Sequence, residues 1–275
     1  MTTDPTSNNM INSTHKNILM VVFHFPPDGA VGARRSEKLA KYLPGYGWTP
    51  HVLTAQERFY DRVEEHPGVP DGCVVVRTGM IRNPMYWSLP LGGGLNPRPT
   101  MKATSPAWKR FVRSLLWMPD DKQGWVPYAV AAGLKHLRAH KIDCIYSSGP
   151  PWTGHLAALA LHIASGLLWA ADFRDPWSTY RFKPAFATSR LSEGTEVILR
   201  RMVYKHASAI ICNTSQAEAD MRKSDPAVSD KLITITNGFD PDDLCICTGG
   251  RGSRRALYLR SGASPAGASP SPTDS

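Results

Sequence analysis

The sequence predicts an α/β fold in which helices cover both faces of a parallel sheet. Short apolar runs alternate with amphipathic stretches of helical length along most of the chain, and this alternation is typical of βαβ units. The apolar runs are continuous, as in strands that are buried on both faces. We therefore expect one doubly wound domain over Asn17–Leu244, between a disordered leader, Met1–Lys16, and a disordered low-complexity tail, Cys245–Ser275.

The first unit runs from a strand through a Pro-Pro turn into a basic helix. The strand, Ile18–Phe23, is an apolar run that ends before Pro26 and Pro27. Gly29 and Gly32 then allow a tight turn and a close approach to a bound group. Because the free N–H groups of the following helix point at that group, an anion or a sugar hydroxyl suits the site.

Two arginines lie in the first turn of this helix. Arg34 and Arg35 oppose the helix dipole, which favours acids at that end. They are either exposed surface charges, which are common on helices, or one of them serves a ligand.

The other elements continue the alternation. Further strands are expected at Pro50–Ala55, Cys73–Thr78, Ile142–Ser147, Leu167–Phe173, Ala209–Asn213 and Leu232–Thr236. Helices are expected at Gly124–His140, Pro151–Ser165, Leu191–His206 and Ser215–Lys223, the last capped by Thr214 or Ser215. Met80–Thr104 is rich in Gly, Pro and Asn and is expected to form a long surface loop.

A basic amphipathic helix is expected at Trp108–Met118. Its apolar positions recur with helical spacing, while Lys109, Arg110 and Arg113 lie off that stripe. The stripe fits packing on the domain's own core, and it also fits docking on an anionic membrane surface.

Composition narrows the partners. The net charge of +9 over 275 residues suggests an anionic partner such as a phosphate-bearing substrate, a membrane surface or nucleic acid. Nucleic acid is disfavoured, because four arginines and one aspartate place +3 of that charge in the tail. Five cysteines without a framework spacing, and no signal peptide before Asn17, indicate a cytoplasmic protein.

Ligands of open parallel sheets bind outside the carboxyl ends of the strands, near the point where the strand order reverses. Two candidate loops come from the first half of the predicted sheet. One runs from Pro27 to Arg35, and the other offers the Ser148 hydroxyl, Gly149 and the amides of a helix start, with His155 one turn inside the helix. These groups are candidates for binding a polar substrate.

Two further loops follow later strands. Asp172, Arg174 and Asp175 put three charges directly at a strand end, with Trp177 beside them. Charges this close to a buried strand form a structural ion pair or serve a function, because burying them unpaired is costly. The last loop contains Asn237-Gly238, which is also an ordinary turn signal.

These loops, in this order, carry a resemblance to a known family. The pattern FPPxxxxGxxRxxxLA occurs at Phe25–Ala40, SGPP at Ser148–Pro151, DFRDPW at Asp172–Trp177 and TNGFD at Thr236–Asp240. Together they resemble the N-terminal domain of family 4 glycosyltransferases. The resemblance covers about Asn17–Asp240.

The resemblance implies a GT-B architecture, in which a Rossmann-like N-terminal domain holds the acceptor and a second one holds a nucleotide-diphosphate sugar. It implies sugar transfer with retention at the anomeric carbon and without a metal cofactor. The acceptor would be a saccharide, free or lipid-linked, in glycan, polysaccharide or glycolipid synthesis. A protein of this kind is cytoplasmic, with attachment to the inner face of a membrane left open.

The resemblance also implies roles for single residues. Gly29, Gly32 and Arg35 would lie near the donor phosphate and the acceptor. The charged residues of the third loop, Asp172, Arg174 and Asp175, would form the acceptor-side catalytic loop. Asn237 would precede the linker to the second domain.

The chain departs from the family after Leu244, where no second Rossmann-like domain follows. Stabilisation of the leaving diphosphate is a major part of catalysis in such enzymes, so we expect the chain alone to be weak or inactive. The rival hypothesis is a non-catalytic acceptor-binding or partner-dependent module.

Other classes fit less well. A dinucleotide-binding oxidoreductase needs GxGxxG after the first strand and an acid after the second, but the chain has Gly29-x-x-Gly32 and Thr54. His136 and His140 have metal-ligand spacing on a helix but no evident third ligand. Cys245-x-Cys247 is too tight for the usual CxxC site.

Overall fold

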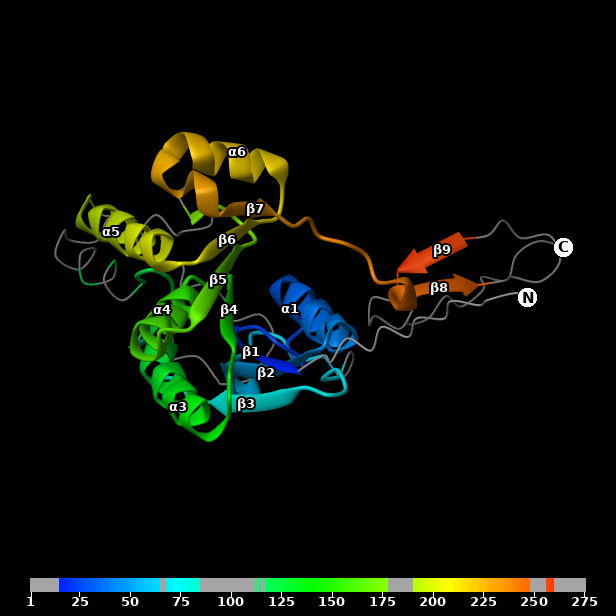
Figure 1. Ribbon diagram of the computed structural model, residues 1–275. Coiled ribbons are helices and arrows are strands. Elements are labelled where there is room, and N and C mark those ends of the chain that lie inside the picture. The colour runs from blue at the N-terminus through cyan, green and yellow to red at the C-terminus, as the bar shows by residue number, and fades with distance from the viewer. Residues whose placement is uncertain are drawn as a thin grey trace, which may run out of the picture.

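The computed structural model describes residues 15–64, 68–84, 112, 114, 117–177, 190–247 and 256–259. Seven parallel strands form its central sheet, in the order β3-β2-β1-β4-β5-β6-β7 (Figure 1). The strands are β1 (Lys16–Val21), β2 (Trp48–Ala55), β3 (Val74–Thr78), β4 (Cys144–Gly149), β5 (Leu168–Phe173), β6 (Ala209–Cys212) and β7 (Leu232–Thr234). The predicted Rossmann-like parallel sheet is confirmed.

Helices connect the strands. They are α1 (Val31–Tyr42), α3 (Val126–Ala139), α4 (Thr153–Ser165), α5 (Arg190–His206) and α6 (Ser215–Ser224). Thr214 caps α6, because its side chain accepts a hydrogen bond from the Ala217 N–H at 3.1 Å. Helix α3 begins at Val126 and not at Gly124 as expected, because Gln123–Trp125 forms a 3₁₀ turn before it.

The two faces of the sheet bury different sets of side chains. Leu19 and Val21 of β1 point into a large core under α3, α4 and α5, whereas Met20 and Val22 point into a smaller core that includes Ala40 of α1. Neighbouring residues of a strand point to opposite faces, so a strand covered on both sides is apolar throughout. This explains the continuous apolar runs.

The pairing register of the strands places the candidate loops at one edge of the sheet. Val21 of β1 pairs with Ser147 of β4, and Ser148 pairs with Asp172 of β5. The carboxyl ends of these three strands therefore lie side by side. Strand order reverses between β1 and β4, because β2 and β3 lie on one side of this pair and β5 to β7 on the other.

The ends of the domain differ from expectation. Lys16 begins β1 instead of ending a disordered leader. Leu244, expected as the last residue of the domain, begins β8 (Leu244–Cys247), which pairs antiparallel with β9 (Ala256–Leu259) (Figure 1). The expectation of a disordered tail does not hold for these two strands, which contain the longest apolar runs of that segment.

The predicted amphipathic helix Trp108–Met118 lies mostly outside the described residues. Val112 and Ser114 are helical; Val112 is half exposed and Ser114 is buried. The two readings of this helix stay predictions.

Candidate active site

We call the carboxyl ends of β1, β4 and β5, with the loops that follow them, the switch edge. A parallel sheet binds ligands at such a point of reversal. The structure brings residues from all four predicted loops together there, as the following contacts show.

Asp172 is the centre of this edge. Its side chain is completely buried and accepts hydrogen bonds from Arg35 Nε at 2.9 Å and Arg35 Nη2 at 3.0 Å. Tyr146 Oη donates to the same carboxylate at 2.6 Å and Ser148 Oγ at 3.0 Å. Both oxygens are thus engaged, which suits a residue that positions its neighbours. The predicted catalytic role of Asp172 stays a prediction.

Burial and the charge of Asp172 shift the pKa values of Arg35 and Tyr146. Burial lowers the pKa of Arg35, but the hydrogen bond and the charge of Asp172 outweigh it and raise the pKa overall. Burial, with the Asp172 charge beside it, holds the pKa of Tyr146 well above its ordinary value. Arg35 is therefore a cation, and the Tyr146 hydroxyl keeps its proton.

Arg35 also reaches the fourth loop. Its Nη1 donates to Asn237 Oδ1 at 2.9 Å, and its Nη2 donates to the Ile235 carbonyl at 2.9 Å. β7 ends at Thr234, two residues earlier than predicted, directly before this contact. Arg35 thus joins three of the predicted loops.

Arg174 reaches back to the first loop. It donates from Nε to the Gly149 carbonyl at 3.4 Å and from Nη2 to the Pro150 carbonyl. A Cβ atom on Gly32 would overlap Arg174 Nη1. Glycine at this position therefore lets the guanidinium lie against the start of α1. Asp175 is exposed, and its charge partly opposes the lowering of the Arg174 pKa by burial.

His155 lies below the second loop. Its Nδ1 is 2.8 Å from Ser147 Oγ, which also accepts a hydrogen bond from Trp169 Nε1 at 2.8 Å. The ring is completely buried, and burial lowers the pKa of His155 to about 3, so it is neutral. Among the described residues its Nε2 has no partner, and it would lie 2.8 Å from a Cβ atom on Gly149.

Trp177 is buried too. Its ring stacks on Trp152 with centroids 5.2 Å apart and planes 8° apart, and its Nε1 has no hydrogen-bond partner in the described part of the chain. His155 and Trp177 therefore support the switch edge from below, and their predicted contact with substrate stays a prediction.

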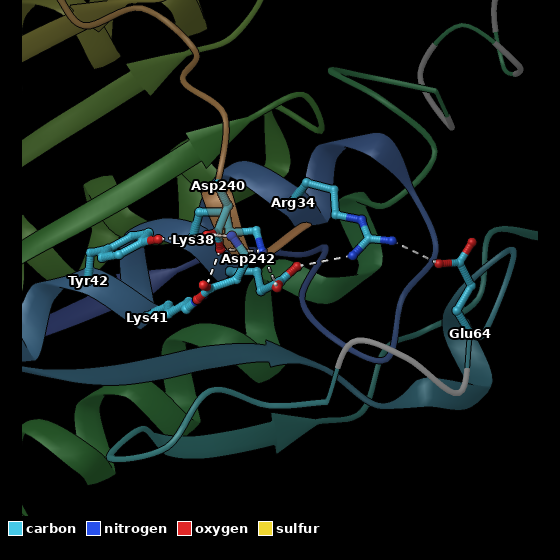
Figure 2. A network of polar contacts seen from close by, with 8 residues as sticks. Arg34, Lys38, Lys41, Tyr42, Glu64, Asp240 and Asp242 are labelled. Atoms are coloured by element: carbon cyan, nitrogen blue, oxygen red, sulfur yellow. Dashed lines mark hydrogen bonds and ion pairs between the residues drawn. The ribbon is translucent and has the colours of Figure 1, made fainter. Parts of the chain in front are cut away.

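Pro27 and Gly29 are held by the segment that precedes β3. Glu64 N–H donates to the Pro27 carbonyl at 2.8 Å, and Gly29 N–H donates to the Arg62 carbonyl at 2.9 Å. A Cβ atom on Gly29 would lie 2.7 Å from Glu64 Cγ. In this structure the close approach that Gly29 permits is to the protein's own Glu64, to which Arg34 is also bonded (Figure 2).

The chain leaves β7 along α1, and we call Ile235–Asp242 the exit segment. Figure 2 shows Asp240 and Asp242 meeting the helix near Lys38, Lys41 and Tyr42. Asp240 is buried and accepts hydrogen bonds from both lysines and from Tyr42 Oη, each at 2.7 Å. Lys41 also bonds Asp242 at 2.6 Å.

Sequence reasoning missed a partly buried acid at this edge. Asp120 caps α4, because it accepts hydrogen bonds from the Thr153 N–H at 2.9 Å and from Thr153 Oγ1. Burial raises the pKa of Asp120. The run Asp120-Asp121-Lys122 directly before Trp125 was the available signal. His24 and Asp28 were also missed, although Asp28 lies within the first predicted loop and His24 lies just before it.

The histidines singled out as metal candidates lie elsewhere. His136 stacks on His140 with centroids 4.1 Å apart, and its Nε2 lies 2.7 Å from Nδ1 of His51 in β2. In the ranges that the structure describes, no three metal-ligating side chains converge as a metal site requires. None of the helices in those ranges has the length and hydrophobicity that a bilayer crossing needs.

The chain was compared with known proteins. The family model for Glycosyltransferase Family 4 matches residues 32–243. Comparison with curated protein sequences gives no match.

Solved structures resemble the chain at low sequence identity. HepE (Alr3699) of Anabaena, in complex with UDP and glucose, is 14% identical with a TM-score of 0.46, over 83% of this chain and 48% of that one. UGT71G1 of Medicago truncatula, complexed with UDP-glucose, is 10% identical with a TM-score of 0.44, over 82% of this chain and 52% of that one. The chain thus spans about half the length of these structures.

The family match covers most of the chain, including the carboxyl ends of β4 and β5 and the exit segment. The chain belongs to glycosyltransferase family 4.

Proposed function

We propose that the chain is the acceptor-side half of a nucleotide-sugar-dependent glycosyltransferase of the retaining, hexosyl-transferring type. It acts in glycan, polysaccharide or glycolipid synthesis in the cytoplasm. Its donor is a nucleotide-diphosphate sugar, it needs no metal, and its acceptor is a saccharide, free or lipid-linked. The proposed retention at the anomeric carbon and the proposed class of donor are inferred from the family to which the chain belongs.

One observation carries this proposal. Arg174 is a partly buried cation that forms no ion pair with any described residue, and its guanidinium lies against Gly32 in the first turn of α1. That turn contains no acidic residue and has no side-chain cap. A helix N-terminus beside a cation favours an anion. A phosphate group, from the nucleotide sugar or from a lipid-linked saccharide, supplies one.

The other predicted site residues lie around Asp172 and Arg174. Asp172 holds Arg35 toward the exit segment and accepts a hydrogen bond from Ser148, while Arg174 donates to the Gly149 carbonyl and is followed by Asp175. The catalytic loop of the proposal is therefore Asp172 to Asp175, with Arg174 as the group that contacts phosphate.

Binding tests the phosphate contact. We expect the chain to bind UDP-glucose or pyrophosphate, and Arg174→Gln to weaken that binding by roughly 10- to 100-fold, the usual loss for a hydrogen bond to a charged group. Arg222→Gln is the matched control, because Arg222 is an exposed arginine on α6. Equal affinities of the two variants contradict the assignment.

Turnover tests the reaction. With a panel of nucleotide sugars and saccharide acceptors, we expect the isolated chain to release little nucleotide diphosphate, because groups that stabilise the leaving diphosphate come from the donor half. Robust turnover by the chain alone overturns the proposal that it is half of the machinery. Saccharide binding without any donor binding favours the non-catalytic acceptor module.

A peripheral membrane location is part of the proposal for a lipid-linked acceptor. It rests on the basic amphipathic pattern of Trp108–Met118. Co-sedimentation with vesicles of phosphatidylcholine and phosphatidylglycerol should exceed that with phosphatidylcholine alone. The double change Lys109→Glu and Arg113→Glu should abolish the difference, and sedimentation indifferent to both favours packing on the core.

A further inference from the structure

The segment Arg62–Glu64 pairs with the first predicted loop, and we call it the strap. Its two ends form backbone hydrogen bonds with Pro27 and Gly29, at 2.8 and 2.9 Å. Its middle residue, Val63, forms an antiparallel bridge with Asp28. The strap therefore covers the loop like a short added strand, and the Gly29 amide has its acceptor within the chain.

The Glu64 side chain lies between two arginines. Its Oε2 accepts a hydrogen bond from Arg34 Nη2 at 3.2 Å (Figure 2), and its Oε1 lies 2.9 Å from Arg62 Nη2. A Cβ atom on Gly29 would lie 2.7 Å from Glu64 Cγ, so the side chain fills the space that the glycine leaves. Only 16% of the side chain is exposed. Two guanidinium groups that bind the two oxygens of one carboxylate are also suited to bind phosphate.

Arg34 is held from a second side. Its Nη1 donates to Glu37 Oε2 at 3.5 Å, and the Glu37 side chain is 4% exposed. Arg34 therefore keeps one acidic partner when Glu64 moves away, and its Nη2 becomes available to another anion. The sequence left a surface role and a ligand role open for the two arginines of this helix turn, and this geometry favours a ligand role for Arg34.

We propose that the strap is autoinhibitory: the Glu64 carboxylate occupies the place of a ligand diphosphate at Arg34, and the diphosphate must displace it. The inference rests on the function proposed above, in which a diphosphate comes from the nucleotide sugar or from a lipid-linked saccharide. One anion replaces another in this exchange, so Arg34 and Arg62 keep a negative partner throughout. The strap is then attached to the loop by its backbone bonds alone, and it opens away from Gly29.

The competing role of Glu64 is structural, since its ion pairs with Arg34 and Arg62 also hold the loop in shape. The two roles predict effects of opposite sign on anion binding. A structural carboxylate supports the loop, so its removal leaves the affinity for an anion unchanged or lowers it. A competing carboxylate keeps part of the molecules closed to the ligand, so its removal raises the affinity.

Glu64→Gln removes the charge and keeps the size of the side chain and the backbone bonds of the strap. We expect its affinity for pyrophosphate, measured by calorimetry, to exceed that of the wild-type chain by roughly 3- to 10-fold, as for the loss of one or two partly exposed ion pairs. Glu57→Gln is the matched control, because Glu57 precedes the strap in the connection between β2 and β3 and lies 3.6 Å from Arg77. It removes the same net charge, so an equal gain in Glu57→Gln contradicts the proposal.

The variant Arg34→Gln shows where the gain in affinity arises. In a chain that carries Arg34→Gln, the further change Glu64→Gln should give no gain, because the site for which the carboxylate competes is lost. A gain that persists in that chain overturns the proposal.

Two larger ligands distinguish the sources of the diphosphate. UDP-glucose and farnesyl diphosphate are titrated in the same way, and the ligand whose affinity rises in Glu64→Gln is the one that displaces the carboxylate. A gain with neither of them overturns the proposal, even where pyrophosphate itself binds more tightly.

Amide hydrogen exchange tests the displacement in the unchanged chain. The Glu64 amide donates to the Pro27 carbonyl, and we expect its exchange to become faster when pyrophosphate saturates the chain, although a bound ligand usually stabilises the folded state. Exchange in the central strands should stay slow. A strap that becomes better protected binds together with the ligand, and this result overturns autoinhibition.

The strap and Arg174 can be tested separately, because Glu64 approaches the loop at Gly29 and Arg174 approaches it at Gly32. Weaker pyrophosphate binding in Arg174→Gln, with no gain in Glu64→Gln, overturns autoinhibition and leaves the proposed function standing. The absence of pyrophosphate binding both in the wild-type chain and in Glu64→Gln overturns autoinhibition and the proposed phosphate contact together.

Discussion

The Arg174 guanidinium occupies the space that a side chain at Gly32 would need. The two residues are far apart in the sequence, and each is part of a different predicted loop. Their contact places a cation against the first turn of α1, and it explains the requirement for glycine by packing, without any special backbone conformation.

Gly32→Ala should therefore act on function more than on stability. The added methyl group displaces the flexible end of Arg174, so we expect a loss of about 1 kcal/mol in the free energy of unfolding, as for one lost hydrogen bond. Binding of UDP-glucose or pyrophosphate should fall as far as in Arg174→Gln. Urea unfolding and calorimetry measure the two effects. Gly45→Ala is the control, because a Cβ atom there meets nothing within 4 Å.

Asp172→Asn should be strongly destabilising. Removing one charge of a buried ion pair leaves the other uncompensated, and we expect a loss of about 3 kcal/mol or more in the free energy of unfolding. Tyr146→Phe removes one neutral donor to the same carboxylate and should cost about 1 kcal/mol. Asp220→Asn, on the exposed surface of α6, should cost close to nothing. A mild effect of Asp172→Asn would mean that Arg35 finds another partner.

Sequence patterns predicted the sheet and the four loops because both depend on local signals. Apolar runs of strand length, separated by amphipathic helices, leave few possible arrangements of a parallel sheet. Ser148 and Asp172 could be placed at one edge for the same reason, since the ends of parallel strands meet there.

Side-chain partners could not be predicted in this way. The Arg35–Asp172 pair depends on the direction in which α1 crosses the sheet, and Asp120 caps a helix that begins 33 residues later. His155 was predicted to bind substrate because it lies near a strand end, and its complete burial beside that end was not evident from the sequence. The His24–Asp28 pair lies within five residues, yet only the fold of the Pro-Pro turn brings the two side chains together.

His155 should make stability depend on pH. Burial lowers its pKa to about 3, below the ordinary value of 6.5. The unfolded chain then binds more protons below pH 6.5, so stability is full above that value and decreases as the pH falls toward the folded pKa. Between about pH 6.5 and 5 the loss from one such histidine is about 2 kcal/mol.

The variant His155→Gln should show a shallower decrease in urea unfolding over this range. Part of the decrease should remain, because burial and neighbouring histidines also lower the pKa of His136 to about 4. His15→Gln changes an exposed histidine before β1 and should keep the wild-type slope. A slope that is equally steep in His155→Gln would show that His155 is not buried in solution.

The last prediction concerns the exit segment. Burial opposes the charge of Asp240, but hydrogen bonds from Lys38, Lys41 and Tyr42 outweigh it and lower the Asp240 pKa. The folded pKa is thus below the unfolded value of ~3.9. The stabilisation is present above the unfolded value and is lost as the pH falls through the folded one.

Amide hydrogen exchange measures this loss of stabilisation for each residue of the exit segment. The amides of Ile235–Asp242 should be protected near neutral pH and lose protection in acid before the central sheet does, because the ionised Asp240 holds the segment to α1. Asp240→Asn should remove that protection at neutral pH as well, while Asp230→Asn, an exposed acid before β7, should not. Since Arg35 bonds both Asp172 and this segment, release should also raise exchange at the start of α1. Release confined to the exit segment would show that Asp172 alone fixes Arg35.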